Sequence, residues 1–165
     1  MRFWTCICGL IALTLITLAP PAFAQRLLDE IVQHQNQLEG LRLQIHGSRQ
    51  RIFTTPSRFA TEQVAAVQMG FAETAVSSIH REFAVLIMVT GLASMITERT
   101  FTPKARAFLY EQKRLMMELL VTYINYLERE LPKPNDQETS RFLLEARDNL
   151  KVSRAIVEKF DPTAL

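Results

Sequence analysis

The sequence predicts an all-α protein, an antiparallel four-helix bundle with a five-helix bundle as the alternative, preceded by a cleavable signal peptide. The chain has 165 residues but only five glycines, which argues against an all-β fold rich in tight turns. Hydrophobic residues make up 48% and charged residues 22%, a balance typical of a globular domain. Long segments carry apolar residues at helical spacing, and no segment alternates convincingly as a strand would.

The first 24 residues predict a secretory signal peptide. A single basic residue, Arg2, precedes an apolar stretch from Phe3 to Ala19, and two prolines and a small-x-small sequence follow. This order is that of an export signal, so we expect cleavage between Ala24 and Gln25. The mature protein would be one domain, residues 25–165. The alternative is an uncleaved membrane anchor, for which the apolar stretch is short.

The composition of the mature chain favours the bacterial periplasm. Both cysteines, Cys6 and Cys8, lie within the predicted signal peptide, so residues 25–165 contain none. A small exported protein without disulfides depends on the packing of its core. The mature chain also lacks an N-x-S/T glycosylation sequence. Its near-neutral charge gives no reason to expect nucleic acid as a partner.

We expect the first helix at about residues 26–53. From Leu27 to Ile52 its apolar positions step by four and three residues, with His34 and Ser48 as polar interruptions. This spacing is that of a coiled-coil seam and predicts that the stripe faces another helix.

The second helix is expected at about residues 56–98. Gly70 lies inside it and costs up to about 1 kcal/mol relative to alanine. It predicts a bend, and the helix would fold back there in the five-helix alternative.

Two further helices are expected at about 103–131 and 136–160. Thr102-Pro103 is a start signal, and Pro132 and Pro134 end the first of the two. Asn135, followed three residues later by Glu138, predicts a capping box at the start of the second. Short connections between four helices favour an antiparallel bundle.

The run from Phe83 to Ile96 is apolar on every face, which predicts burial on every face. We interpret it as core or as a subunit interface. Alternatives are the wall of an apolar ligand pocket and a transmembrane helix, but fifteen residues span only about 22 Å against a hydrocarbon core of about 30 Å. The candidate interface or pocket residues are Phe83, Ile87, Thr90 and Ser94.

A basic tip is predicted around the first turn of the bundle, where residues 41–60 include no acid. Clustered arginines can contact phospholipid headgroups, lipopolysaccharide phosphates or an acidic protein. A solvated surface with no function is the alternative. The candidate residues for an anionic contact, including peripheral contact with a membrane, are Arg42, Arg49, Arg51 and Arg58.

Motifs for catalysis or metal binding are absent from the sequence. No histidine has the Glu-x-x-His spacing of di-iron bundles, no two histidines are four apart, and no G-x-S-x-G is present. The methionines are interpreted as core residues rather than as copper ligands. His34 is expected to bond to Glu30 or water at the end of a seam. We therefore expect no cofactor, no metal and no enzymatic activity.

These observations favour a non-catalytic periplasmic protein that acts through protein–protein contacts, as an adaptor, accessory or assembly factor of the cell envelope. Its partner would be another protein or a second copy of itself. The alternative is a binding or sensing module that holds a small apolar or anionic ligand between helices near residues 83–94.

Overall fold

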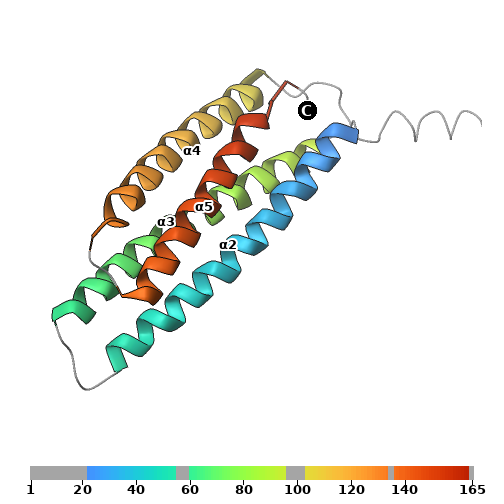
Figure 1. Cartoon of the computed structure of the whole chain (residues 1–165). Helices are drawn as coiled ribbons and strands as arrows, with labels where there is room; N and C mark the ends of the chain where they lie inside the picture. Colours follow the sequence, from blue (N-terminus) through green and yellow to red (C-terminus); the bar gives the residue numbers. More distant parts are fainter. Residues whose placement is uncertain (1–21, 55–59, 96–102, 134–135, 164–165) are drawn as a thin grey trace, which may run out of the picture.

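A computed structural model describes residues 22–54, 60–95, 103–133 and 136–163, and these form four α-helices (Figure 1). The helices are α2 (Ala22–Thr54), α3 (Ala60–Met95), α4 (Pro103–Glu130) and α5 (Gln137–Lys159). None of the described residues is in a β-strand. The predicted all-α fold with four helices is therefore confirmed.

Helices that follow one another around the bundle (α2–α3, α3–α4, α4–α5 and α5–α2) are antiparallel, because contacting residue pairs run in opposite order along them. Such pairs are Gln35–His80 and His46–Glu73 between α2 and α3, Ser78–Tyr123 and Gln68–Glu130 between α3 and α4, Lys113–Phe160 and Glu128–Lys151 between α4 and α5, and Glu30–Lys159 and Arg51–Glu138 between α2 and α5. The elongated bundle in Figure 1 has α2 and α4 on opposite sides, with α3 and α5 between them.

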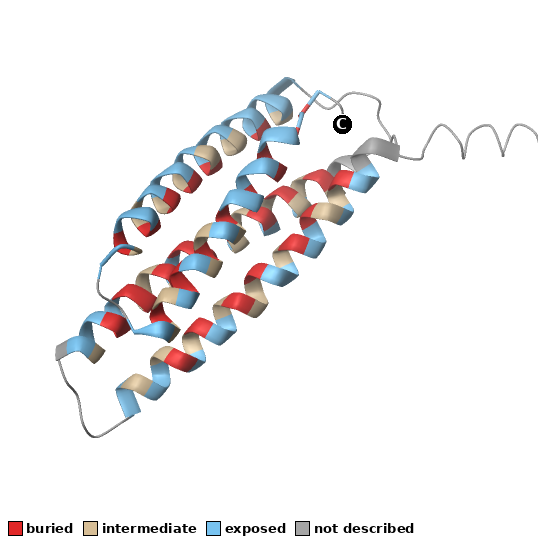
Figure 2. Cartoon of the chain, viewed as in Figure 1, coloured by how far each residue is buried: buried red, intermediate tan, exposed pale blue. Residues whose placement is uncertain are grey.

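The predicted seam of α2 faces the interior. Ile31, Leu38 and Ile45 are almost completely buried, and so are the polar interruptions His34 and Ser48. Figure 2 shows the same arrangement on all four helices, with buried residues on the inner side and exposed residues outside. Complete burial of each large aliphatic side chain contributes about 1.5–3 kcal/mol, so one continuous stripe accounts for the docking of a 33-residue helix.

The five-helix alternative is wrong for the described residues, because α3 runs without a break from Ala60 to Met95. Gly70 lies within this helix, and none of the glycines that the structure describes has a positive φ. The reason for glycine at this position is a close approach of α2, described below.

The predicted capping box of α5 is displaced by one residue. Asp136 is the N-cap, and its carboxylate accepts a hydrogen bond from the Thr139 backbone N–H at 2.8 Å. Glu138 instead accepts a hydrogen bond from Arg51 of α2. Asn135 lies outside the described residues. The residue that caps α5 is Asp136, the neighbour of the predicted Asn135, because asparagine and aspartate are about equally suited to this position.

The predicted signal peptide lies largely outside the described residues, which begin at Ala22. The predicted cleavage point, between Ala24 and Gln25, falls within the first turn of α2. Cleavage there, and with it the boundary of the mature domain, stays a prediction.

Candidate functional site

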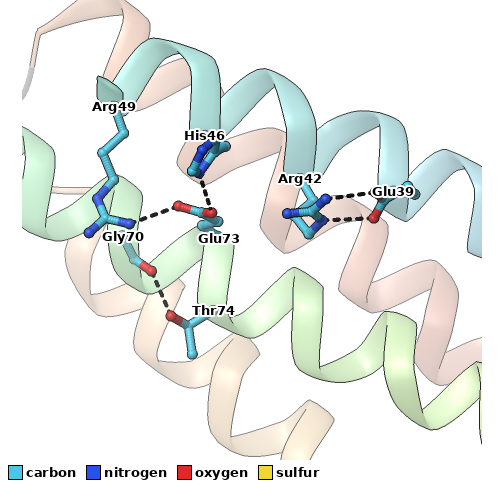
Figure 3. Close-up of polar contacts among 7 residues, drawn as sticks. All are labelled: Glu39, Arg42, His46, Arg49, Gly70, Glu73 and Thr74. Atoms are coloured by element: carbon cyan, nitrogen blue, oxygen red, sulfur yellow. Dashed lines mark hydrogen bonds and ion pairs between the residues drawn. The ribbon is translucent and has the colours of Figure 1, made fainter. Parts of the chain in front are cut away.

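The most concentrated polar cluster lies along the seam between α2 and α3 (Figure 3). Glu73 of α3 accepts a hydrogen bond from Arg49 Nη1 at 2.8 Å, and its other oxygen lies 2.8 Å from Nδ1 of His46. Both partners come from α2, one turn apart. The side chain of Glu73 is mostly buried, so this acid is held by two α2 side chains at the edge of the core.

A second polar group, more exposed than the first, lies one to two turns before His46 on α2. Arg42 donates two hydrogen bonds of 2.7 Å to the carboxylate of Glu39, and His80 Nε2 of α3 lies 4.0 Å from the same carboxylate. Hydrogen bonding to Arg42 lowers the pKa of Glu39 below its usual value. Exposed pairs of this kind contribute about 0–1 kcal/mol to stability, so this group is a surface feature of the seam.

Gly70 makes room for the Arg49 side chain. A Cβ at position 70 would lie 3.2 Å from both Cζ and Nε of Arg49, closer than ordinary contact. The guanidinium also lies 5.6 Å from the centroid of the Phe53 ring, within the range of a cation–π contact. The absence of a side chain at position 70 therefore leaves room for the Arg49 side chain to cross the backbone of α3 and reach Glu73.

His34 forms a buried polar link between α2 and α5. Its Nε2 lies 2.8 Å from Ser153 Oγ, and its Nδ1 lies 3.2 Å from Gln37 Oε1. Ser153 Oγ also donates to the backbone carbonyl of Asn149 at 3.0 Å. The ring stands edge-on to Phe83 with centroids 5.8 Å apart. Burial lowers the pKa of His34 below 6.5, which favours a neutral imidazole.

The partner expected for His34 was wrong: Glu30 pairs with Lys159, and the imidazole bonds instead to Gln37 and Ser153. A Ser–His pair thus forms from residues far apart in the sequence. Because both side chains are buried, their position suits a structural link between helices better than contact with a substrate.

A second buried polar group, which sequence reasoning missed, joins α3 to α4. Gln68 Nε2 donates to Glu130 at 3.1 Å, and Lys133 donates to the other carboxylate oxygen at 2.6 Å. The hydrogen bond from Lys133 lowers the pKa of Glu130. Nearby, Phe71 stacks on Tyr126 with ring centroids 3.5 Å apart. The signal in the sequence was a glutamine at an inward position of α3.

The predicted interface or pocket residues face the interior of the bundle. Phe83 is completely buried, Ile87 is partly buried against the core, and Thr90 is 7% exposed. The Thr90 hydroxyl has no hydrogen-bond partner among the described residues. The Ser94 side chain lies outside the described part of the chain. The interface or pocket therefore stays a prediction.

The predicted basic tip carries its own counter-ions. Arg42 bonds to Glu39, Arg49 to Glu73 and Arg51 to Glu138. These acids lie outside residues 41–60, which explains why the segment looks unpaired in the sequence. Arg58 lies outside the described residues. An anionic contact at this tip stays a prediction.

An outward stripe on α3 was also missed. Its members follow alternating steps of three and four residues and are exposed or half-buried: Val64, Val67, Phe71, Thr74, Ser78, Arg81, Val85 and Met88. Val64 is 53% exposed, Val67 69% and Met88 58%. We call these eight residues the outer stripe of α3. Its spacing is that of the buried seam of α2. On one side of the stripe Phe71 and Ser78 contact Tyr126 and Tyr123 of α4, whereas Val64, Val67 and Met88 remain exposed.

In the described part of the chain, no group of three or more His, Cys, Asp or Glu residues is placed to hold a metal ion. None of the described helices has a stretch both long and apolar enough to cross a bilayer.

No protein-family model, curated protein or solved structure matches this chain. Function therefore has to be inferred from the chain's own residues.

Gly70→Ala tests the contact with Arg49. Alanine should gain up to about 1 kcal/mol in helix propensity, but its Cβ should displace Arg49 from Glu73 and cancel much of that gain. In the Arg49→Ala background the full gain should return, as it should for Gly40→Ala, where no atom lies within 4 Å of the added Cβ. Urea unfolding of the four variants measures the coupling. If Gly70→Ala raises the free energy of unfolding by the same amount with and without Arg49, the contact between position 70 and Arg49 has no effect on stability.

His34 should make the protein less stable on mild acidification. Its pKa is lowered in the folded state, so the unfolded chain takes up a proton first as pH falls below about 6.5. The free energy of unfolding should drop by up to about 1.4 kcal/mol per pH unit until the folded-state pKa is reached. Urea unfolding between pH 5 and pH 7.5 measures this slope.

The His34→Gln variant should show a smaller change of unfolding free energy with pH. His80→Gln, at a half-buried position on the seam, should keep the wild-type pH dependence. A wild-type slope retained in His34→Gln would contradict the assignment.

Proposed function

We propose that this chain is a non-catalytic helical-bundle protein of the bacterial periplasm that acts through protein–protein contacts, in an adaptor, accessory or assembly role in the cell envelope. The outer stripe of α3 is the observation that supports it best. The signal-peptide pattern of residues 1–24 supports the location.

The outer stripe has the spacing that one helix uses to pack against another. Alternating steps of three and four residues keep side chains on one face of a helix and form the seam of coiled coils. Val64, Val67 and Met88 expose apolar surface there to solvent. These residues form two apolar ends of the stripe, and exposed apolar groups on one face of a helix are typical of protein-binding faces.

This stripe supports a protein contact better than the basic tip does. The described arginines of the tip are paired with Glu39, Glu73 and Glu138, so binding an external anion there would compete with existing ion pairs. Val67 and Met88 need no such rearrangement, because their side chains are already exposed.

Site-specific photo-crosslinking in cells tests this proposal. A photoreactive amino acid in place of Val67 or Met88 should give discrete cross-linked protein products in the envelope fraction. The matched control is Leu144 on the outer side of α5, which is also a large apolar residue and 41% exposed. Products at all three positions, or at none, would contradict a contact through α3.

A binding module for a small ligand is the second candidate, and it is supported by Thr90. Its hydroxyl is buried within the apolar half of α3 and has no partner among the described residues. A buried hydroxyl without a partner costs about 1–3 kcal/mol, and a ligand near Phe83 and Ile87 could satisfy it.

Thr90→Val separates the two candidates. If the site is dry and empty, removal of the unsatisfied hydroxyl should raise the free energy of unfolding by about 1 kcal/mol. Thermal unfolding of protein released from the periplasm measures this change. A fall in stability together with the loss of a co-purifying small molecule, seen by native mass spectrometry, would favour the binding module.

A further inference from the structure

We propose that Met88 is an oxidation site that regulates the contact made by the outer stripe of α3. Conversion of its thioether to a sulfoxide places a polar group at an apolar end of the stripe and releases the partner. This inference rests on the proposed function, since it names the chemistry that controls the same surface.

Methionine supplies all the sulfur of residues 25–165. These residues contain no cysteine, and their methionines are Met69, Met88, Met95, Met116 and Met117. Cysteine thiolates react readily with oxidants, and here none is present to compete. The proposed location outside the cytoplasm is also an oxidising one. Oxidation of this chain by peroxides or hypochlorous acid therefore begins at a methionine.

Met88 is the most exposed of the methionines whose side chains the structure describes. Its exposed fraction is 58%, whereas Met69 and Met116 are each only 1% exposed and Met117 packs against the core. The side chain of Met95 lies outside the described part of the chain. An oxidant must reach the sulfur atom, so a completely buried methionine reacts only when the bundle opens. The difference in exposure predicts that Met88 reacts before Met69 and Met116.

The neighbours of Met88 on the helix surface leave its side chain accessible. Residues three and four apart lie next to each other on a helix, and for Met88 these include the exposed Ala84 and the half-buried Gly91. A Cβ added at Gly91 would meet no described atom within 4 Å. Neither neighbour has a side chain long enough to cover a thioether, so the sulfur stays open to small oxidants.

The reaction changes the polarity of the stripe without touching the core. One oxygen atom is transferred to the Met88 sulfur, which loses two electrons, and hydrogen peroxide is reduced to water or hypochlorous acid to chloride. The sulfoxide is polar and chiral, and it disrupts interfaces that contain methionine. Methionine sulfoxide reductases reverse the step, so the change can act as a switch.

Peptide mass spectrometry after treatment of the folded protein with dilute hydrogen peroxide tests the site. Met88 should be oxidised at least about tenfold faster than Met69 and Met116, because buried side chains react only through opening of the structure. In urea the three rates should become equal. The melting temperature of the Met88 sulfoxide form should match that of untreated protein, since this side chain lies outside the core. Equal rates in the folded protein would overturn the site.

Photo-crosslinking from position 84, one turn before Met88, tests the regulation. After brief exposure of cells to hypochlorous acid, cross-linked products should fall at least about fivefold, because the contact would have to bury a polar sulfoxide. Met88→Leu is the matched control, since leucine is apolar, of similar volume and of similar helix propensity. Its products should persist under the same treatment. Met88→Gln, a polar residue of similar length, should lower the products without any oxidant.

The possible failures differ from those of the proposed function. Products from position 84 that persist when Met88 is fully oxidised would overturn the regulation and leave the proposed function standing. Equal losses in the wild type and in Met88→Leu would overturn the assignment to Met88. Absence of products from positions 67 and 84 in untreated cells would contradict the proposed function and, with it, this inference.

Discussion

The structure depends on the unusually apolar surface of α3. Its inner residues, among them Met69, Ile79 and Phe83, are almost completely buried. It also has antiparallel contacts with both α2 and α4. Because residues 25–165 contain no cysteine for a disulfide, the stability of the bundle comes from this packing. A helix that is apolar on several sides can serve as the centre of a small domain.

The buried polar pairs give this apolar core a defined arrangement. Leucine and alanine stripes can slide past one another at little cost, whereas a buried polar atom that loses its partner costs about 1–3 kcal/mol, more than an average hydrogen bond contributes. His34 with Ser153 aligns α2 with α5, and Gln68 with Glu130 aligns α3 with α4. Each pair joins two helices whose apolar faces alone would tolerate more than one alignment.

The sequence predicted the helices well because their signals are local. The seam from Leu27 to Ile52 and the Pro103 start depend on neighbours within one or two turns, and both are observed. The sequence could not predict the partners of polar residues on different helices. His34 and Ser153 are 119 residues apart in the chain, and no periodicity within one helix indicates which residue of another will meet it.

The same limit applies to the candidate site. Arg42, Arg49 and Arg51 looked unpaired because the segment around them has no acid. In the structure, Glu73 of α3 pairs with Arg49 and Glu138 of α5 pairs with Arg51. Gly70 looked like a bend, and its role became clear only with Arg49 in place. The outer stripe was visible in principle, but α3 has apolar residues on several sides, and the sequence alone does not show which of them face the core.

The inner and outer faces of α3 therefore need different explanations. Burial within the bundle accounts fully for Ile79 and Phe83. It does not account for Val64, Val67 and Met88, whose surface stays in contact with water. Single exposed apolar residues are common and need no explanation, but these recur at the spacing of a helix-packing seam. That spacing is the reason we propose this face of α3 as the surface that contacts another protein.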